Sequence, residues 1–182
     1  MHFFKVILAL ALAAVPITAI PVDENGIVSE GQYLEARTDT HVTCKPKHNP
    51  ANKSFKVSMN YARAQAKAAG FPPTGHHTGS GDPHRYGNGD KIEWGVKGCN
   101  KKNAELWEYP IYWEGMEEKG KTKEWKKDHS SNGQTKTPLR VVYIKDKGTH
   151  DERAKVCGVM THSKIVTVGD GFRGENFFQK CK

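Results

Sequence analysis

Three ionisable side chains stand inside segments that are otherwise apolar. Glu108 lies within LWEYPIYW, Arg140 within LRVVYIK, and His162 at the end of VCGVMTH. Because side chains alternate across a strand, each of the three points to one definite face of the sheet that such segments form. If the strands are neighbours, one face gathers a carboxylate, a guanidinium and an imidazole. His84 in DPHRY can join them from a strand that follows a loop.

This set of groups suits the cleavage of an RNA phosphodiester by its own 2′-hydroxyl. The reaction needs a base for the 2′ proton, an acid for the departing 5′ oxygen, and positive charge beside the five-coordinate phosphorus. We predict that Glu108 is the base and His162 the acid, while Arg140 and His84 neutralise phosphate oxygens. Histidine has an unperturbed pKa of about 6.5 and is charged in mildly acidic surroundings. The scheme needs no metal and no cofactor.

Each residue also has a structural interpretation. Glu108 can be an exposed edge residue paired with a lysine, and Arg140 a cross-strand partner at the surface. A single histidine at a strand end, such as His162, is more often structural than catalytic. The aromatic residues of 106–113 are expected in a hydrophobic core rather than as a platform for RNA bases.

One helix and several strands must position these residues. Ser58 is a good N-cap, alanines recur at helical spacing after it, and Gly70 followed by two prolines ends the helix. Pro110 would place its strand at a sheet edge or a bulge. A helix followed by strands without helical crossovers predicts an α+β fold with a bent antiparallel sheet. The segments with strand-like composition are 92–96, 106–113, 139–145, 156–162 and 176–180.

Two polar segments are predicted to be loops, the second of them long and exposed. Residues 72–90 are rich in Gly, Pro and Asp. Their histidines match neither HExxH nor another zinc pattern, so we expect no metal site there. Residues 114–138 form a second polar segment with basic and acidic side chains intermixed; its lysines include Lys119, Lys121, Lys123, Lys126 and Lys127.

The first forty residues have the composition of targeting and processing segments. Residues 1–19 combine an early lysine, an apolar run and a small-residue end, which is typical of a secretory signal peptide. The alternative is a buried N-terminal helix. Residues 20–40 are acidic and aperiodic and are predicted to be a propeptide, although no dibasic pair marks its end. We therefore expect one domain over residues 41–182.

The charge of the chain suggests a polyanionic partner. The 182 residues carry 28 basic and 20 acidic side chains, a net charge of +8. Residues 1–40 hold two of the basic and five of the acidic ones, so the remainder carries 26 and 15, a net +11. Such a field favours RNA, DNA, anionic lipid or heparin-like sugar, and solubility is the simpler explanation. The mean hydropathy of −0.70 excludes a polytopic membrane protein.

Four cysteines follow the leader, and an even number in a secreted chain predicts two disulfides. Spacing alone permits three pairings, and the absence of CxxC argues against a zinc knuckle. The sequence Asn52-Lys53-Ser54 is a candidate glycosylation site, which indicates an exposed turn. The cysteines are Cys44, Cys99, Cys157 and Cys181.

Seven segments, taken in order and with their spacing, carry a resemblance to a known family. They resemble the fungal ribotoxins, secreted relatives of the small microbial guanyl-type ribonucleases, and among these the short-looped hirsutellin type. The likeness covers about residues 42–182. The segments are VTCKPK (42–47), SGDPHRY (80–86), WGV with Cys99 nearby (94–99), LWEYPIYW (106–113), LRVVY (139–143), CGVMTHSK (157–164) and FFQKC (177–181).

The resemblance implies a bent antiparallel sheet on one helix and the cleavage of one phosphodiester in the sarcin–ricin loop of the large ribosomal RNA, which stops translation. By motif position it implies the same base, acid, assisting histidine and phosphate-binding arginine as above. It places Asp82 where the hirsutellin type has an aspartate, and it makes Phe178 a wall of the pocket. Tyr143, on the same strand as Arg140, would belong to that pocket. The implied disulfides pair Cys44 with Cys181 and Cys99 with Cys157.

The resemblance also implies partners. Ribotoxins use exposed basic loops to hold the ribosome and to approach acidic phospholipid membranes, and the lysines of 114–138 could serve here. We expect a secreted monomer that acts in the cytosol of target cells. The chain departs from the hirsutellin type at 76–77, 114–138 and 165–174. A non-specific secreted ribonuclease and a non-catalytic cationic protein that binds membranes or polyanions are the alternatives.

Overall fold

The computed structural model describes residues 39–73, 75–146 and 153–182. The predicted signal peptide and all but the last two residues of the predicted propeptide lie outside the described residues. No helix within the described ranges is long and apolar enough to cross a membrane.

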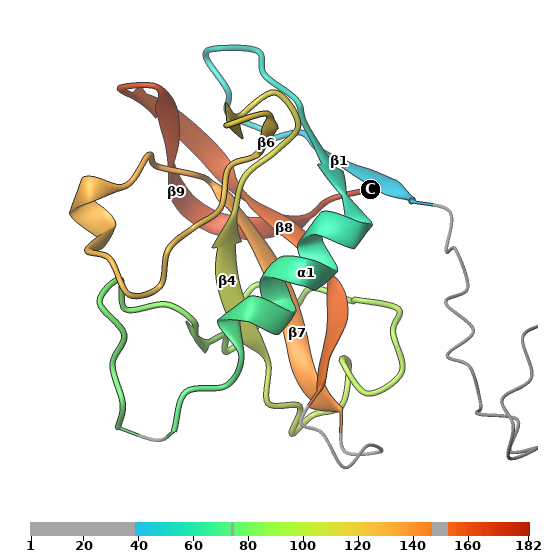
Figure 1. Ribbon diagram of the computed structural model, residues 1–182. Helices are drawn as coiled ribbons and strands as arrows, with labels where there is room; N and C mark the ends of the chain where they lie inside the picture. The colour runs from blue at the N-terminus through green and yellow to red at the C-terminus, as the bar shows by residue number, and fades with distance from the viewer. Residues whose placement is uncertain (1–38, 74, 147–152) are drawn as a thin grey trace, which may run out of the picture. The chain divides into compact units, whose positions relative to one another are not determined.

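The described residues form one α-helix, one short 3-10 helix and nine strands (Figure 1). The helices are α1 (Met59–Ala69) and η1 (Ser131–Gly133). The strands are β1 (His41–Cys44), β2 (Phe55–Ser58), β3 (His84–Arg85), β4 (Trp107–Ile111), β5 (Glu117–Glu118), β6 (Lys121–Thr122), β7 (Leu139–Asp146), β8 (Arg153–Val168) and β9 (Gly171–Lys180).

Five strands make the main sheet, in the order β3-β4-β7-β8-β9 with every neighbour antiparallel. Irregular pairing between Val142 and Tyr143, and between His162 and Lys164, bends the sheet. The two-residue β3 pairs only with Trp107 and Glu108 of β4. Pro110 therefore lies where that edge of β4 has no strand beside it, as its missing N–H requires. The predicted α+β fold with a bent antiparallel sheet is confirmed.

The helix begins and ends where the sequence predicts. The Ser58 hydroxyl accepts a hydrogen bond from the Tyr61 N–H at 3.1 Å, which caps the first turn. Gly70 ends the helix with a φ of 66°, and its N–H donates to the Ala66 carbonyl at 3.2 Å. The alanine face of α1 packs on β4, β7 and β8, across which the helix lies in Figure 1.

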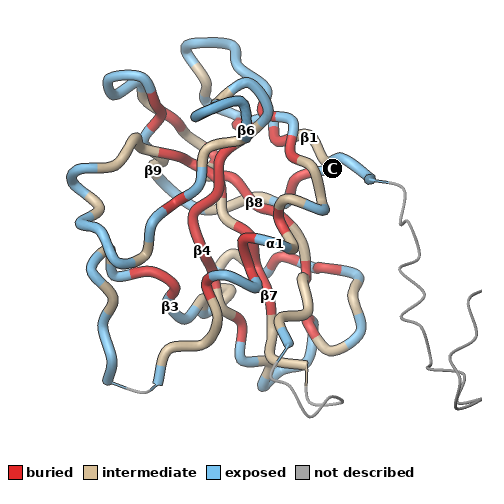
Figure 2. The backbone as a smooth tube through the Cα atoms, in the orientation of Figure 1, coloured by how far each residue is buried: buried red, intermediate tan, exposed pale blue. Residues whose placement is uncertain are grey.

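The main sheet buries both of its faces, as the red stretches of β4, β7 and β8 show in Figure 2. The face toward α1 carries the larger core, with Tyr109, Val141 and Tyr143 from alternate positions. The opposite face carries a smaller core in which Val142 and Met160 contact residues of the 92–106 region. Arg140 and Glu108 have the parity of this second face, and so does His162. The two cores therefore fix which face holds the polar groups.

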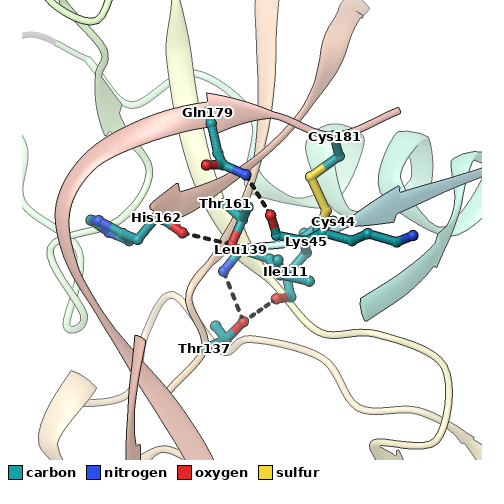
Figure 3. The surroundings of a disulfide bond; sticks show 9 residues. All are labelled: Cys44, Lys45, Ile111, Thr137, Leu139, Thr161, His162, Gln179 and Cys181. Carbon is teal, nitrogen blue, oxygen red and sulfur yellow. Dashed lines mark hydrogen bonds between the residues drawn. A yellow bond between two sulfur atoms is a disulfide. The ribbon is translucent and has the colours of Figure 1, made fainter. Parts of the chain in front are cut away.

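Both disulfides form with the pairing that the resemblance implies. Cys44 joins Cys181 across a sequence separation of 137, and Cys99 joins Cys157. Figure 3 shows the first bridge beside the start of β7 and the end of β9, close to Thr161. The bridge closes nearly the whole described chain into one loop, which restricts the unfolded ensemble.

The predicted strand at 92–96 is wrong. Lys91 and Gly95 both have positive φ angles, of 55° and 71°, which breaks the extended geometry at each end. The Trp94 N–H donates to the Asn100 side chain at 2.8 Å instead of to another strand. Ile92 and its neighbour Trp94 are nevertheless buried in the smaller core, so their hydrophobicity serves packing and not pairing.

The segment 114–138 is more structured than the exposed loop that its polarity predicts. It contains the β5–β6 hairpin and η1. Trp125 is buried, and its carbonyl accepts a hydrogen bond from the Tyr109 hydroxyl at 2.7 Å. Lys127 donates to the carbonyls of Ala68 and Ala69 at the end of α1. A tryptophan anchor and a helix-capping lysine thus tie this segment to the larger core.

Candidate active site

The pairing of β3 with β4 brings the first two predicted residues together. His84 is the register partner of Glu108. Its Nε2 lies 2.6 Å from Glu108 Oε1, and its Nδ1 lies 3.0 Å from Asp82 Oδ1. The imidazole therefore bridges two carboxylates, one from the loop before β3 and one from β4.

This bridge sets the charge of His84. The hydrogen bond that the ring donates to Asp82, and then the one that it donates to Glu108, raise the pKa of His84 to about 9, so the ring is a cation at neutral pH. Glu108 is 5% exposed, and its Oε2 is buried without a hydrogen-bond partner among the described residues. One carboxylate oxygen is thus held by the imidazolium while the other is left to accept a proton.

Arg140 comes from the next strand, β7. Its Nη1 donates to the carbonyls of Thr137 and Leu139 at 3.0 and 2.8 Å. Its Nε is buried and has no partner within the described part of the chain. The backbone therefore holds one nitrogen of the guanidinium, while the Nε donor remains for an anion such as phosphate.

His162 comes from β8 and is held by β9. Its Nδ1 lies 3.0 Å from the Asn176 carbonyl oxygen, which can only accept, so Nδ1 donates and Nε2 is left for proton exchange. The Phe178 ring covers the imidazole at a centroid distance of 3.9 Å. Burial is the main cause that lowers the pKa of His162, partly opposed by the Asn176 carbonyl.

Phe178 is itself anchored. Its N–H donates to Asp90 Oδ2 at 3.1 Å, and the Tyr86 hydroxyl donates to the same oxygen at 3.2 Å. The Tyr86 ring meets Phe178 edge-on at 5.8 Å. The loop that contains Asp90 thereby fixes the aromatic wall behind His162.

Part of this set of side chains lines one cleft of about 330 Å³. Four predicted residues line it directly, and Glu108 lies immediately behind His84. The positive charge of Arg140 lowers the pKa of His162 and the negative charge of Glu108 raises it, both less than burial lowers it. The direct lining includes Asp82, His84, Arg140 and His162.

Of the predicted pocket residues, Phe178 does not line the cleft itself but covers the His162 ring, and Tyr143 is not brought to the cleft at all. Tyr143 is fully buried on the α1 side of the sheet, where its hydroxyl donates to the Gly70 carbonyl at 2.9 Å and its ring contacts Phe71. Tyr143 is three positions after Arg140, so strand alternation sends the two side chains to opposite faces.

In the described ranges no group of three or more His, Cys, Asp or Glu residues could hold a metal ion.

Beyond the four predicted residues, eight others line the cleft, including Ser80 and Gly81 from the loop before β3 and Ser131 and Thr137 from the 114–138 segment. Trp125 and Lys136 reach it from the 114–138 segment, while Arg173 and Gly174 reach it from β9. The buried Trp125 could have been suspected from its type, as a lone aromatic in a polar segment. Lys136, Arg173 and Gly174 have no local signal, because only the folding of distant segments brings them to the cleft.

Comparison with known proteins identifies the class. A family model described as ribonuclease matches residues 40–182, so the chain belongs to the ribonuclease family. It is an endoribonuclease, and RNA is its substrate. No relative was found among the curated proteins.

Two solved structures make the resemblance more particular. Hirsutellin A from Hirsutella thompsonii is 46% identical, with a TM-score of 0.58, and the match covers 78% of this chain and 98% of hirsutellin A. Restrictocin, an Aspergillus ribotoxin, is 19% identical, with a TM-score of 0.54 and coverage of 78% and 99%, and it shows the shared fold. The resemblance to the fungal ribotoxins is confirmed.

Proposed function

We propose that the protein is a secreted ribotoxin that cuts one phosphodiester in the sarcin–ricin loop of large-subunit ribosomal RNA and thereby stops translation. The observation that carries the chemistry is the cleft itself. A cationic imidazole, an arginine and a second imidazole line it, and the Glu108 carboxylate, with one oxygen free of hydrogen bonds among the described residues, lies behind the first imidazole; this set supports the proposed chemistry.

The first chemical step is an internal transesterification. Glu108 Oε2 accepts the 2′ proton while the 2′ oxygen bonds to phosphorus. The bond from phosphorus to the 5′ oxygen breaks, and His162 Nε2 gives that oxygen its proton. The products are a 2′,3′-cyclic phosphate and a free 5′-hydroxyl.

The second step hydrolyses the cyclic phosphate with the roles reversed. Neutral His162 takes a proton from water, whose oxygen attacks phosphorus. The bond from phosphorus to the 2′ oxygen breaks, and protonated Glu108 returns its proton to that oxygen, leaving a 3′-phosphate. In both steps His84 and Arg140 offset the negative charge on the five-coordinate phosphorus. The Asp82 carboxylate holds His84 in place by accepting a hydrogen bond from the Nδ1 of its ring.

The 46% identity to hirsutellin A over 98% of that chain supports a ribosomal target. Exposed basic side chains would supply the salt-sensitive part of ribosome binding. Lys119, Lys121 and Lys126 are exposed and available for phosphate contacts. Lys123 donates to the Thr135 hydroxyl, and Lys127 caps α1. Only part of the lysine-rich segment therefore serves binding.

Secretion, a monomeric state and contact with acidic phospholipids during uptake complete the proposal. Two buried disulfides fit an oxidising compartment. The basic excess of the described domain suits an anionic lipid surface. Asn52, in an exposed turn after β1, remains the candidate glycosylation site.

Intact ribosomes provide the decisive test. The protein should release one discrete fragment from the 3′ end of the large rRNA, and Glu108→Gln should release none under the same conditions. Glu105→Gln, which changes an exposed carboxylate just before β4, is the matched control and should behave as the parent does. General degradation of the rRNA would instead indicate a non-specific secreted ribonuclease. Toxicity that persists in Glu108→Gln would indicate a non-catalytic cationic protein.

A further inference from the structure

The strand β9 touches the His162 imidazole with a glycine. A Cβ atom placed on Gly174 would lie 2.0 Å from Cδ2 and 2.3 Å from Cγ of His162. Real Cβ contacts essentially never fall below 3.0 Å, so any other residue would displace the ring or the strand. Gly174 is not among the residues with positive φ, so its backbone does not require glycine. Space beside the imidazole is what requires it.

The same stretch of β9 makes the other contacts of the ring. Between the pairs His162–Phe178 and Lys164–Glu175, two residues of β9 oppose one of β8, which is a β-bulge. Asn176 lies in this bulge with a φ of 62°, a left-handed conformation that asparagine adopts more readily than most residues. Its carbonyl oxygen accepts a hydrogen bond from Nδ1 of the His162 imidazole. The ring is therefore enclosed by Gly174, by the Asn176 carbonyl and by the Phe178 ring.

We propose that Gly174 is a positioning residue for His162: by letting β9 pack directly on the imidazole, it keeps Nδ1 on the Asn176 carbonyl and Nε2 toward the cleft. This inference rests on the proposed role of His162 as the acid. A ring with free space on that side could rotate and present a carbon to the leaving oxygen. Displacing a reacting group by about 1 Å can cost about 10²-fold in rate.

A second glycine of the same strand provides a matched control. A Cβ on Gly171 would lie 2.2 Å from the Lys136 carbonyl oxygen and 2.8 Å from the Thr135 methyl. This close approach attaches the start of β9 to the 114–138 segment, and the Phe172 N–H donates to the same carbonyl at 3.0 Å. Gly171→Ala thus introduces a comparable clash in the same hairpin without a direct clash with His162.

The experiment compares Gly174→Ala and Gly171→Ala with Gly133→Ala, whose Cβ would meet open space. Cleavage of the dinucleoside phosphate GpA gives kcat and KM, and long-range ¹H–¹⁵N NMR spectra of the free protein report the tautomer of His162. We expect Gly174→Ala to lower kcat about 10²-fold with KM changed less than about twofold. We also expect loss of the Nδ1–H tautomer. Gly171→Ala should lower the melting temperature but keep the tautomer, and Gly133→Ala should match the parent.

The proposal is overturned if Gly174→Ala keeps both the parental kcat and the parental tautomer, or if Gly171→Ala changes the tautomer to the same extent. Should Gly174→Ala not fold, the double variant with His162→Gly decides, because it removes Cβ together with the ring and so removes all three of the close contacts. The double variant should then fold, and failure to fold would count against the proposal. A failure of the proposed function has a different signature, namely parental turnover in His162→Gln, and the NMR measurement does not depend on turnover.

Discussion

The cleft contains two histidines whose surroundings act in opposite directions. His84, on β3, has a carboxylate at each ring nitrogen, and its pKa is raised to about 9. His162, on β8, has a backbone carbonyl at one nitrogen and an aromatic ring on its face, and burial lowers its pKa. The same residue type is therefore a fixed cation on one side of the cleft and a titrating group on the other.

The difference supports a division of labour. A group that neutralises phosphate must keep its charge throughout the reaction, which a raised pKa ensures. A group that gives up a proton in one step and takes one in the next must change its protonation state near the working pH. His84 meets the first requirement and His162 the second. The residue environments thus support the same roles as the motif positions do.

The largest effect is expected from the replacement of His162, the histidine with the lowered pKa. His162→Gln should lower kcat for GpA cleavage about 10²–10⁴-fold, because glutamine cannot supply a proton. His129→Gln removes an exposed histidine from the 114–138 segment and should leave kcat unchanged. Circular dichroism verifies that both variants are folded. Parental turnover in folded His162→Gln would remove the acid from the scheme.

The pH dependence separates the two histidines directly. Because His162 must be protonated to act as an acid and its pKa is lowered, kcat/KM for the first step should fall about tenfold per pH unit above a pKa that lies below 6.5. His84 remains charged up to about pH 9 and should contribute nothing to this fall. A pH–rate profile that falls only near pH 9 would assign the acid role to His84 instead.

The positive charge of His84 depends on Asp82. Asp82→Asn removes the largest cause of the raised pKa, so the pKa of His84 should move from about 9 toward 6.5 by about one unit or more. An NMR titration of the imidazole measures it. Asp170→Asn, an exposed change in the β8–β9 hairpin, is the control. An unmoved His84 would mean that Glu108 alone holds its proton.

The smallest effect is on stability. A histidine whose folded pKa is raised stabilises the fold fully below the unfolded pKa of about 6.5, and this contribution is lost as the pH rises through 9. His84→Gln should therefore lower the free energy of unfolding by about 1 kcal/mol at pH 6, a value discounted for the exposure of the side chain. The loss should vanish near pH 10. Urea unfolding at both pH values measures it, and equal losses would contradict the linkage.

Much of the fold follows from local chemistry. The Ser58 cap and Gly70 define α1 to the residue, and the apolar runs define β4, β7 and the central part of β8. The strands β1 and β2 were not predicted, because each has four residues and alternates too briefly to show a period. The segment 92–96 shows the opposite error. Its apolar residues suggest a strand, but they pack in the smaller core without backbone hydrogen bonds to any strand of the described ranges.

The site was predictable to the extent that it obeys strand alternation. The sequence indicates that Glu108, Arg140 and His162 each point to one face, and the sheet order makes that face the same. The misplaced Tyr143 breaks the same rule, since an odd spacing from Arg140 already places it on the other side. Gly174 could not be predicted, because its importance lies in a distance to a ring twelve residues away that only the bulge in β9 brings close.

The Cys44–Cys181 bridge has a consequence for an enzyme proposed to end its journey among cytosolic ribosomes. That compartment keeps thiols reduced, so the bond is exposed there to cleavage by thiol exchange. Cys44 is 0% and Cys181 4% exposed, so a reducing thiol reaches either sulfur only when the joined ends of the domain separate. The rate at which those ends separate would then limit the rate of disulfide reduction. Tight packing of the first and last strands would thereby set how long the enzyme stays active in the cytosol.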